Sequence, residues 1–344
     1  QNKIYSVSCP HKGELRTFIK KKGKISMKFP FKLRGPEAAK ALTFPFTDGY
    51  ILKDYSGYVR LGYVNSDLRM HQEIIRCIQN TFGDVSYSQR RVRGAYETYF
   101  AGVLGKIYVK SLGFIPQSKL KTNTHLHEIL LKSKDPTEIG ASLSQIMDDE
   151  GNFSQMTFYV GFSGGEVPRE EIDEVLNNFH SHHIQQEYMP NILKDVKAML
   201  EKLHINSRVR SPVRYVDCTR GVTKLMWYLV IQGSAALLKI NSTCKFENND
   251  LRKKFARYVK HRKNIIKVLK DVEKKKGFLT TDSVKNALNI SKRAAVNIIR
   301  VMKRDKMLDL LEKGRYCYLR EAKKRQHQQD TFRLIKPNIE KAIF

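Results

Sequence analysis

The sequence predicts an α+β protein built from two similar units, each with the order α-β-β-α-β-β and a further helix, followed by a smaller C-terminal module. Two observations predict the paired units: a helix that ends in an acid and a glycine occurs twice, and a similar alternation of apolar and polar residues follows each copy. A third observation, a rise in positive charge near residue 250, sets the C-terminal module apart.

The two acid–glycine helices are expected at residues 36–49 and 136–151. Each begins with Pro, which is tolerated in the first turn because an N–H there has no helical partner. Each ends at Gly, which suits the left-handed conformation that often stops a helix. The acids before these glycines, Asp48 and Glu150, lie 102 positions apart, which is close to the length of one αβ unit.

The segments after the two helices alternate as strands do, and each unit also contains an amphipathic helix. In the first unit we predict strands at 50–53 and 58–64, a helix at 67–82, and strands at 84–91 and 96–103. In the second we predict a strand at 153–162 before a Gly164-Gly165 turn, a helix at 189–203, and strands at 207–216 and 224–231. Two such units, neither of which closes its own core, are expected to pack against each other.

Residues 41–49 and 143–151 resemble the paired helices of the LAGLIDADG homing endonucleases. The resemblance covers roughly residues 33–260, because the strands and helices around both motifs also match. It implies one chain with two repeats whose sheets form a saddle over double-stranded DNA. Outward-facing side chains would read the major groove, and cleavage would occur across the minor groove.

Two helices packed with their C-terminal ends together would bring Asp48 and Glu150 close to each other. Neighbouring carboxylates repel unless a cation lies between them, and hard oxygen ligands suit Mg²⁺ or Mn²⁺. Such an ion can polarise a phosphodiester and activate water. By resemblance, a sheet lysine assists; Lys224 is the positional match in the second repeat, and Tyr96 stands near that place in the first. The hypothesis is a metal-dependent, site-specific double-strand DNA endonuclease.

The sequence departs from this pattern where the two helices would touch. Small residues are usual there, but the positions read Thr43 and Gln145. Pro45 also falls inside the first helix, which costs about 3 kcal/mol unless a kink accommodates it. The sequence therefore predicts a looser or kinked helix pair. The alternative for the acids is that Asp48 merely precedes a turn and that Glu150 belongs to a solvated acidic cluster.

Basic residues on or beside the strands are candidate DNA contacts, since arginine can grip guanine bidentately or hold phosphate. The candidate DNA contacts are Arg60, Arg90, Arg91, Arg93, Arg208, Arg210, Arg214 and Arg220. Trp227 and Tyr228 are instead interpreted as packing residues.

The overall charge supports a polyanionic partner. The chain has 344 residues, a net charge of +29 and a pI near 9.9, and such an excess is self-repelling unless nucleic acid shares the surface. No apolar run is long enough to cross a membrane, and no membrane partner is expected. The five widely spaced cysteines form no CxxC pair, which argues against disulfides and structural zinc and for an intracellular protein in cytoplasm, nucleoid or an organelle.

The C-terminal module carries 28 Lys and Arg against 9 Asp and Glu from Leu251 onward. Helices at 264–276, 280–288 and 292–306, with a hairpin of 307–311 and 316–320, resemble a winged helix-turn-helix. In the third helix, Ala294, Ile298, Val301 and Met302 are expected to face inward. Its exposed, reading side is expected to carry Lys292, Arg293, Asn297, Arg300 and Lys303.

The predicted domains are a basic N-terminal segment at 1–32, repeats at 33–134 and 135–258, the winged helix-turn-helix at 259–322 and a basic tail at 323–344. Because one chain holds both repeats, it should act as a monomer. Two other functions stay open. One is a DNA-binding transcriptional regulator on a catalytically decayed scaffold, and the other is a splicing maturase that binds structured RNA.

Overall fold

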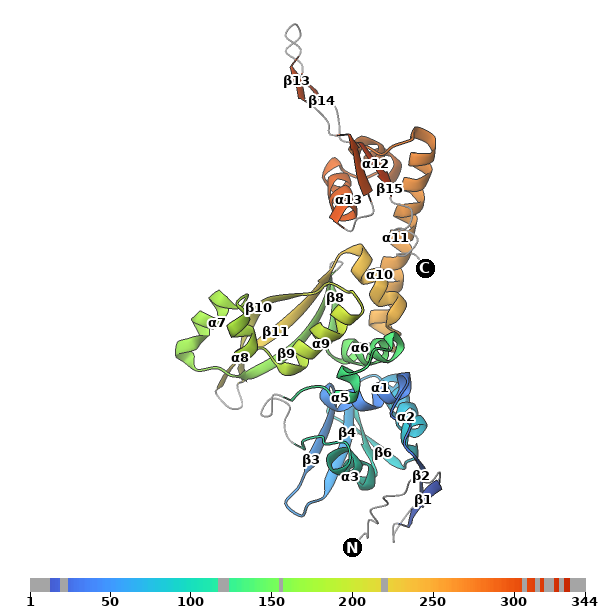
Figure 1. The fold of residues 1–344 in the computed structure, drawn as a ribbon, viewed down its shortest axis with the longest axis vertical. Coiled ribbons are helices and arrows are strands. Elements are labelled where there is room, and N and C mark those ends of the chain that lie inside the picture. Colours follow the sequence, from blue (N-terminus) through green and yellow to red (C-terminus); the bar gives the residue numbers. More distant parts are fainter. Residues whose placement is uncertain are drawn as a thin grey trace. The chain divides into compact units, whose positions relative to one another are not determined.

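The computed structural model describes residues 13–18, 24–116, 124–154, 157–217, 222–304, 308–312, 316–318, 325–327 and 331–334. The chain divides into two compact units: residues 1–154, 158–231 and 243–252 form the first, and residues 155–157, 232–242 and 253–344 form the second. The first unit holds two four-stranded sheets with helices, so the α+β class is confirmed (Figure 1).

The first repeat contains one antiparallel sheet with the strand order β3-β4-β7-β6. Leu61, Tyr63 and Phe100 are buried on its inner face, where His71 contacts the Tyr63 ring with centroids 5.0 Å apart. In chain order its elements are α1 (Pro36–Thr43), η1 (Phe44–Phe46), β3 (Gly49–Lys53), β4 (Val59–Asn65), α2 (Leu68–Phe82), β6 (Tyr87–Val92), β7 (Ala95–Phe100) and α3 (Gly102–Lys110).

The second repeat has the same topology. Its sheet has the order β10-β11-β9-β8, so in both repeats the second strand lies between the first and the fourth. The predicted repetition of the α-β-β-α-β-β unit is thus confirmed. After the short linker helix α5 (Glu128–Leu131), its main elements are α6 (Pro136–Glu150), β8 (Gly151–Ser154), β9 (Thr157–Glu166), α9 (Asn191–Lys202), β10 (Arg208–Asp217) and β11 (Val222–Gln232).

Strand β9 runs through Gly164 and Gly165, so the turn predicted there is wrong. A Cβ atom on Gly164 would lie 3.1 Å from the backbone oxygen of Tyr188 and 3.3 Å from that of Leu225. Glycine is needed here because neighbouring backbone approaches closely, which is a common reason for glycine inside a strand. The chain then forms three short helical segments that the pattern did not predict, η2 (Arg169–Glu171), α7 (Ile172–Asn178) and α8 (His182–Tyr188).

Part of the basic N-terminal segment is a strand pair rather than only a solvated stretch. β1 (Gly13–Phe18) pairs with β2 (Lys24–Phe29), and β2 also pairs with β5 (Gly83–Asp84). Met27 of β2 is fully buried, so this small sheet contributes to the core of the first unit.

The second unit has its own apolar core. α10 (Ser234–Thr243) precedes α11 (Asn249–Lys276), which continues without a break from the first unit and begins well before the predicted residue 264. α12 (Thr281–Leu288) is capped by Thr280 and Ser283, whose side chains each bond to the other's backbone N–H. With α13 (Lys292–Arg304), these helices bury Ile265, Ile266, Leu269, Leu279, Val284, Ala295, Ile299 and Met302.

Two details of the predicted C-terminal module are wrong. On α13 the fully buried residues are Ala295, Ile299 and Met302, while Ala294, Ile298 and Val301 are only half-buried. The buried stripe follows i, i+4 and i+7 spacing, and its centre lies one residue from the predicted one.

The predicted hairpin of 307–311 and 316–320 does not form. β12 (Leu308–Glu312) pairs with β15 (Thr331–Leu334), and β13 (Tyr316–Tyr318) pairs with β14 (Arg325–His327). The segment expected as a basic tail thus supplies strands, and a local glycine turn signal could not reveal a partner that is more distant in sequence. Among the described residues, no helix has the length and apolar character needed to cross a membrane.

An ion pair with little exposure joins α1 and α2. Lys40 Nζ lies 2.7 Å from Glu73 Oε1, and the two side chains are 8% and 11% exposed. Burial alone would raise the pKa of Glu73, but the Arg76 and Lys40 charges that contact it lower that pKa to about 2. The pair is costly to break at Glu73, because the buried Lys40 ammonium would keep only Glu247 as an ion-pair partner, at 3.8 Å.

We expect Glu73→Gln to reduce stability at neutral pH by a few kcal/mol, about what breaking a buried pair costs. The folded-state pKa of Glu73 is depressed, so its contribution is present above pH 4.5 and lost as the pH falls toward 2. Urea unfolding of the wild type should therefore show stability falling over that window, with a flatter profile for the variant. The exposed Glu128→Gln is the control; equal pH profiles for E73Q and wild type would contradict this account.

Candidate active site and nucleic-acid interface

The two acid–glycine segments occupy equivalent places at the starts of β3 and β8. Asp48 and Glu150 are both half-buried. A Cβ atom on Gly49 would lie 2.3 Å from the backbone oxygen of Phe44, and one on Gly151 would lie 2.2 Å from that of Met147. Gly151 has an extended conformation with φ −95°, and Gly49 has no positive φ, so the left-handed helix stop predicted for both glycines is wrong. Both glycines are required because a side chain would collide with the preceding turn.

Helices α1 and α6 lie side by side between the two sheets (Figure 1). Thr43 Oγ1 lies 2.6 Å from Ser142 Oγ, and both residues are buried. α1 ends at Thr43, and Pro45 lies in the 3-10 turn η1 that follows it, so the helix predicted to run through Pro45 stops before this residue. Gln145 makes a hydrogen bond within α6 to Asp149 at 2.7 Å. The helix ends thus stay together although α1 changes geometry.

The centre of this contact is a half-buried carboxylate, that of Asp149, which sequence reasoning did not single out. Asp149 accepts hydrogen bonds from Thr47 Oγ1, from Tyr63 Oη at 2.6 Å and from Gln145. Burial raises the pKa of Asp149, and these hydrogen bonds oppose that rise. Thr47 immediately precedes Asp48, and Asp149 immediately precedes Glu150. Their hydrogen bond therefore ties together the two chain segments that carry the candidate acids.

Asp148 is buried and Asp149 is half-buried, so these two acids do not form a fully solvated cluster. Its carboxylate accepts from the backbone N–H groups of Glu247 at 2.9 Å and Asn248 at 3.1 Å. Burial raises the pKa of Asp148 to about 7, although the two backbone donors act in the opposite direction. Asp148 thus holds the chain that leads into α11. In the sequence, the signal for these two structural acids was the run of three acids, Asp148 to Glu150, at the end of a helix that is otherwise largely apolar.

The Asp48 carboxylate is oriented by the first sheet. Asn65 Nδ2 donates to its Oδ2 at 2.8 Å, and Val64 N–H donates to its backbone oxygen at 3.2 Å. In the described ranges, no group of three or more His, Cys, Asp or Glu side chains is arranged to hold a metal. Two carboxylates still match Mg²⁺, which binds through one or two protein acids and keeps several waters or substrate oxygens.

Lys224, the candidate helper, lies on β11 and is 4% exposed. Along this strand Leu225, Trp227 and Leu229 are fully buried on one face, so Lys224 lies on the other. The prediction that Trp227 packs in the core is confirmed, whereas Tyr228 lies on the same face as Lys224. Tyr96, the first-repeat counterpart, contacts the His71 ring with centroids 6.2 Å apart.

The candidate arginines of the first sheet do not all face the same way. Arg60 and Arg90 share the outer face and lie over the Tyr99 ring, 5.4 Å and 4.9 Å from its centroid. Arg91 is exposed but alternates to the opposite face, where it is paired with Tyr96. Arg93 has a φ of 47° at the β6–β7 turn, so it lies at the sheet end. The outer face therefore groups two of the four.

On the second sheet, Arg208, Arg210 and Arg214 of β10 are exposed. Arg210 lies 5.8 Å from the centroid of the Tyr159 ring. A register shift between Arg210 and Val213 places Arg214 opposite Leu225, on the other face of the sheet. Arg220 lies outside the described residues. Each repeat thus presents an arginine stacked on a tyrosine at its outer face.

The candidate residues of α13 are brought together. Lys292, Arg293, Asn297, Arg300 and Lys303 are all exposed on this helix. They form one polar side opposite the buried stripe, as the sequence predicted.

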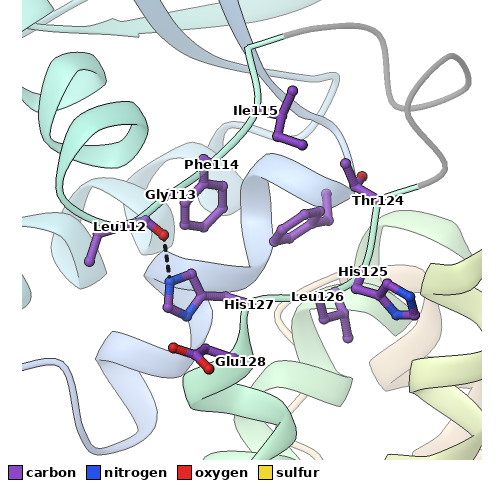
Figure 2. A pocket seen from close by; sticks show the side chains of 10 residues that line it. Leu112, Gly113, Phe114, Ile115, Thr124, His125, Leu126, His127 and Glu128 are labelled. Atoms are coloured by element: carbon purple, nitrogen blue, oxygen red, sulfur yellow. Dashed lines mark hydrogen bonds between the residues drawn. The ribbon is translucent and has the colours of Figure 1, made fainter.

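A cavity of about 450 Å³ lies beside η1 (Figure 2). Phe46, Phe114 and His127 line it, and the His127 ring is stacked on that of Phe114. His127 Nε2 donates to the Leu112 backbone oxygen at 2.8 Å, and its Nδ1 accepts from Ile129 N–H at 3.2 Å. Both ring nitrogens are engaged, so His127 is a packing residue rather than a metal ligand.

No protein-family model matches the chain, and no curated protein matches it in sequence. Among solved structures, the homing endonuclease I-DmoI in complex with DNA and Ca is 12% identical with a TM-score of 0.36, covering 60% of this chain and 88% of that chain. Full-length DUF199/WhiA from Thermatoga maritima is 10% identical with a TM-score of 0.32, covering 80% and 93%. With TM-scores this low, these likenesses assign neither family nor function to the chain.

We expect Tyr63→Phe to destabilise the protein by about 1–3 kcal/mol, because it removes a buried donor from the half-buried Asp149 carboxylate. Denaturant unfolding measures this directly, with the fully exposed Tyr55→Phe as the matched control. A change in Y63F no larger than that in Y55F would mean that the Asp149 contacts do not hold the helix ends together.

Proposed function

We propose that the protein binds double-stranded DNA and hydrolyses its phosphodiester bonds with the help of a divalent metal ion held by Asp48 and Glu150. The observation that carries this proposal is the hydrogen bond from Thr47 to Asp149, because it joins the residues directly before the two acids. Two half-buried carboxylates on adjoining helix ends would repel each other, and a cation relieves that repulsion.

The donor set is suited to Mg²⁺ or Mn²⁺, which would polarise the phosphate and lower the pKa of a bound water. Asp48 would hold its ligand position through Asn65, whose amide fixes one carboxylate oxygen. Glu150, the last residue of α6, would supply the second carboxylate. Lys224 is proposed as a basic helper, since a mostly buried ammonium stabilises negative charge more strongly than an exposed one.

Positive charge and stacked arginines support DNA as the substrate. A net charge of +29 favours a polyanion, and both sheets present an arginine over a tyrosine on their outer faces. Arginine can contact phosphates or the major-groove edge of guanine from such a position. The two repeats in one chain are proposed to act on an asymmetric site as a monomer.

Asp48→Asn and Glu150→Gln should each abolish Mg²⁺-dependent or Mn²⁺-dependent nicking while DNA affinity stays near the wild-type value or rises. Each change removes a metal ligand and also a repulsion with phosphate. The measurement is cleavage of a randomised duplex library beside a binding assay, with Asp54→Asn as an exposed control. If the wild type binds duplexes but cleaves none, the nuclease proposal is wrong and the DNA-binding regulator is favoured. A preference for structured RNA over duplex DNA would favour the splicing maturase.

The second unit is proposed to add DNA contacts through α13. Replacing Lys292, Arg293 and Arg300 by Gln should weaken binding and flatten the slope of log K against log salt by up to about 3, because fewer counterions are released. The same number of exposed lysines in α11, at 253, 260 and 267, provides a control set. An unchanged slope for the α13 variant would show that this helix does not contact DNA.

A further inference from the structure

The outer face of the first sheet carries a carboxylate that is held from several strands. Tyr50 Oη of β3 donates to Glu97 Oε1 at 2.6 Å, and Tyr99 Oη donates to Oε2. Arg90 of β6 donates through Nε to Oε2 at 2.9 Å, and its Nη2 lies 2.9 Å from the same oxygen. We call these four residues the Glu97 cluster. Hydrogen bonds from its two tyrosines and from Arg90 lower the pKa of Glu97 against the effect of burial, so the carboxylate stays charged.

The cluster fixes the direction of the Arg90 guanidinium. Its Nε and Nη2 face Glu97, and its plane lies over the Tyr99 ring 4.9 Å from the centroid. A guanidinium is a rigid planar fork, so its Nη1–Nη2 edge then points away from Glu97. The Arg90 side chain is 60% exposed, whereas that of Glu97 is only 12% exposed. A partner approaching this face would meet the arginine edge rather than the acid.

The second sheet lacks the same pairing at its stacked arginine. Arg90 lies opposite Glu97 across β6 and β7, whereas Arg210 lies opposite Tyr228 across β10 and β11. The two repeats thus share an arginine stacked on tyrosine, but the first adds an acid as its cross-strand neighbour. This acid is more than a solubility feature, because it is sequestered by three side chains.

The charge on Glu97 bears on whether this face would lie against the phosphate backbone of DNA or against the base edges. Beside the phosphate backbone it would be repelled, which weakens binding and offers no compensation. Beside the base edges it can instead hold an arginine in the geometry that fits guanine O6 and N7 bidentately. The hydroxyl and guanidinium donors already occupy both oxygens of Glu97, so it acts through Arg90.

We propose that the Glu97 cluster is a specificity element, in which Glu97 positions Arg90 to read one guanine in the major groove of the half-site bound by the first repeat. This inference rests on the proposed function, since it requires duplex DNA on the outer face of the sheet. Glu97 is a positioning residue, and Arg90 is the base-contacting one.

The test uses the full chain and a duplex library from which the preferred bases at every position are measured by selection and sequencing. Wild type should require guanine at one position, with a discrimination of about 5- to 150-fold, the range for a good bidentate contact. Arg90→Lys keeps the charge but loses the fork, so it should lose that preference alone. Glu97→Gln should reduce the same preference while the salt slope of binding stays unchanged.

Arg69→Lys is the matched control, because Arg69 also donates through Nε and Nη2 to a carboxylate, that of Asp67, but lies at the start of α2 rather than on the outer face of the sheet. Its base preferences should equal those of the wild type. Tyr50→Phe removes one donor to Glu97 and should weaken the same preference less strongly, which keeps the test valid if E97Q does not fold.

Three results would overturn the proposal. Unchanged preferences in R90K would exclude Arg90 as a base reader, and unchanged preferences in both folded E97Q and Y50F would exclude Glu97 as its positioning residue. A change in salt slope without a change in base preference would assign Arg90 to phosphate. Failure of the wild type to bind any duplex would instead overturn the proposed function itself, and the specificity element with it.

Discussion

A half-buried carboxylate at the last turn of α6 is the constraint on which the first unit depends. Asp149 accepts hydrogen bonds from Thr47, Tyr63 and Gln145, and all three of these donor residues are buried. The three donors lie directly after η1, in β4 and in α6, so satisfying one carboxylate aligns both repeats at once. Asp48 directly follows Thr47 and Glu150 directly follows Asp149, so this alignment also constrains where the two acids lie.

The two repeats share a topology but differ in the chemistry at equivalent places. α1 gives way to a 3-10 turn at Pro45, whereas α6 is continuous and buried on nearly every side. Small and hydroxyl residues let these unlike helices approach, as Thr43 and Ser142 show. On the outer faces, Glu97 stands opposite an arginine in one sheet and Tyr228 does so in the other. The two outer faces thus present different side chains at equivalent places.

Acids in this basic protein are placed where they organise other groups. Glu73 lies against Lys40 and Arg76, Asp148 receives the chain before α11, and Glu97 holds Arg90. Each acid is largely buried, so its interactions are less screened than those of the exposed lysines. The excess of basic side chains behind the net charge of +29 therefore lies mainly on the surface, where a polyanion can neutralise it.

The sequence by itself determined the α+β class, the repeated α-β-β-α-β-β order and the exposed basic side of α13, because these depend on periodicity within short segments. Only the tertiary structure decided that Asp149 accepts from Thr47 and Tyr63, that Gly151 avoids a collision, that β9 runs through Gly164 and that β12 pairs with β15. These features depend on atoms far apart in the chain, whose approach a local pattern does not encode.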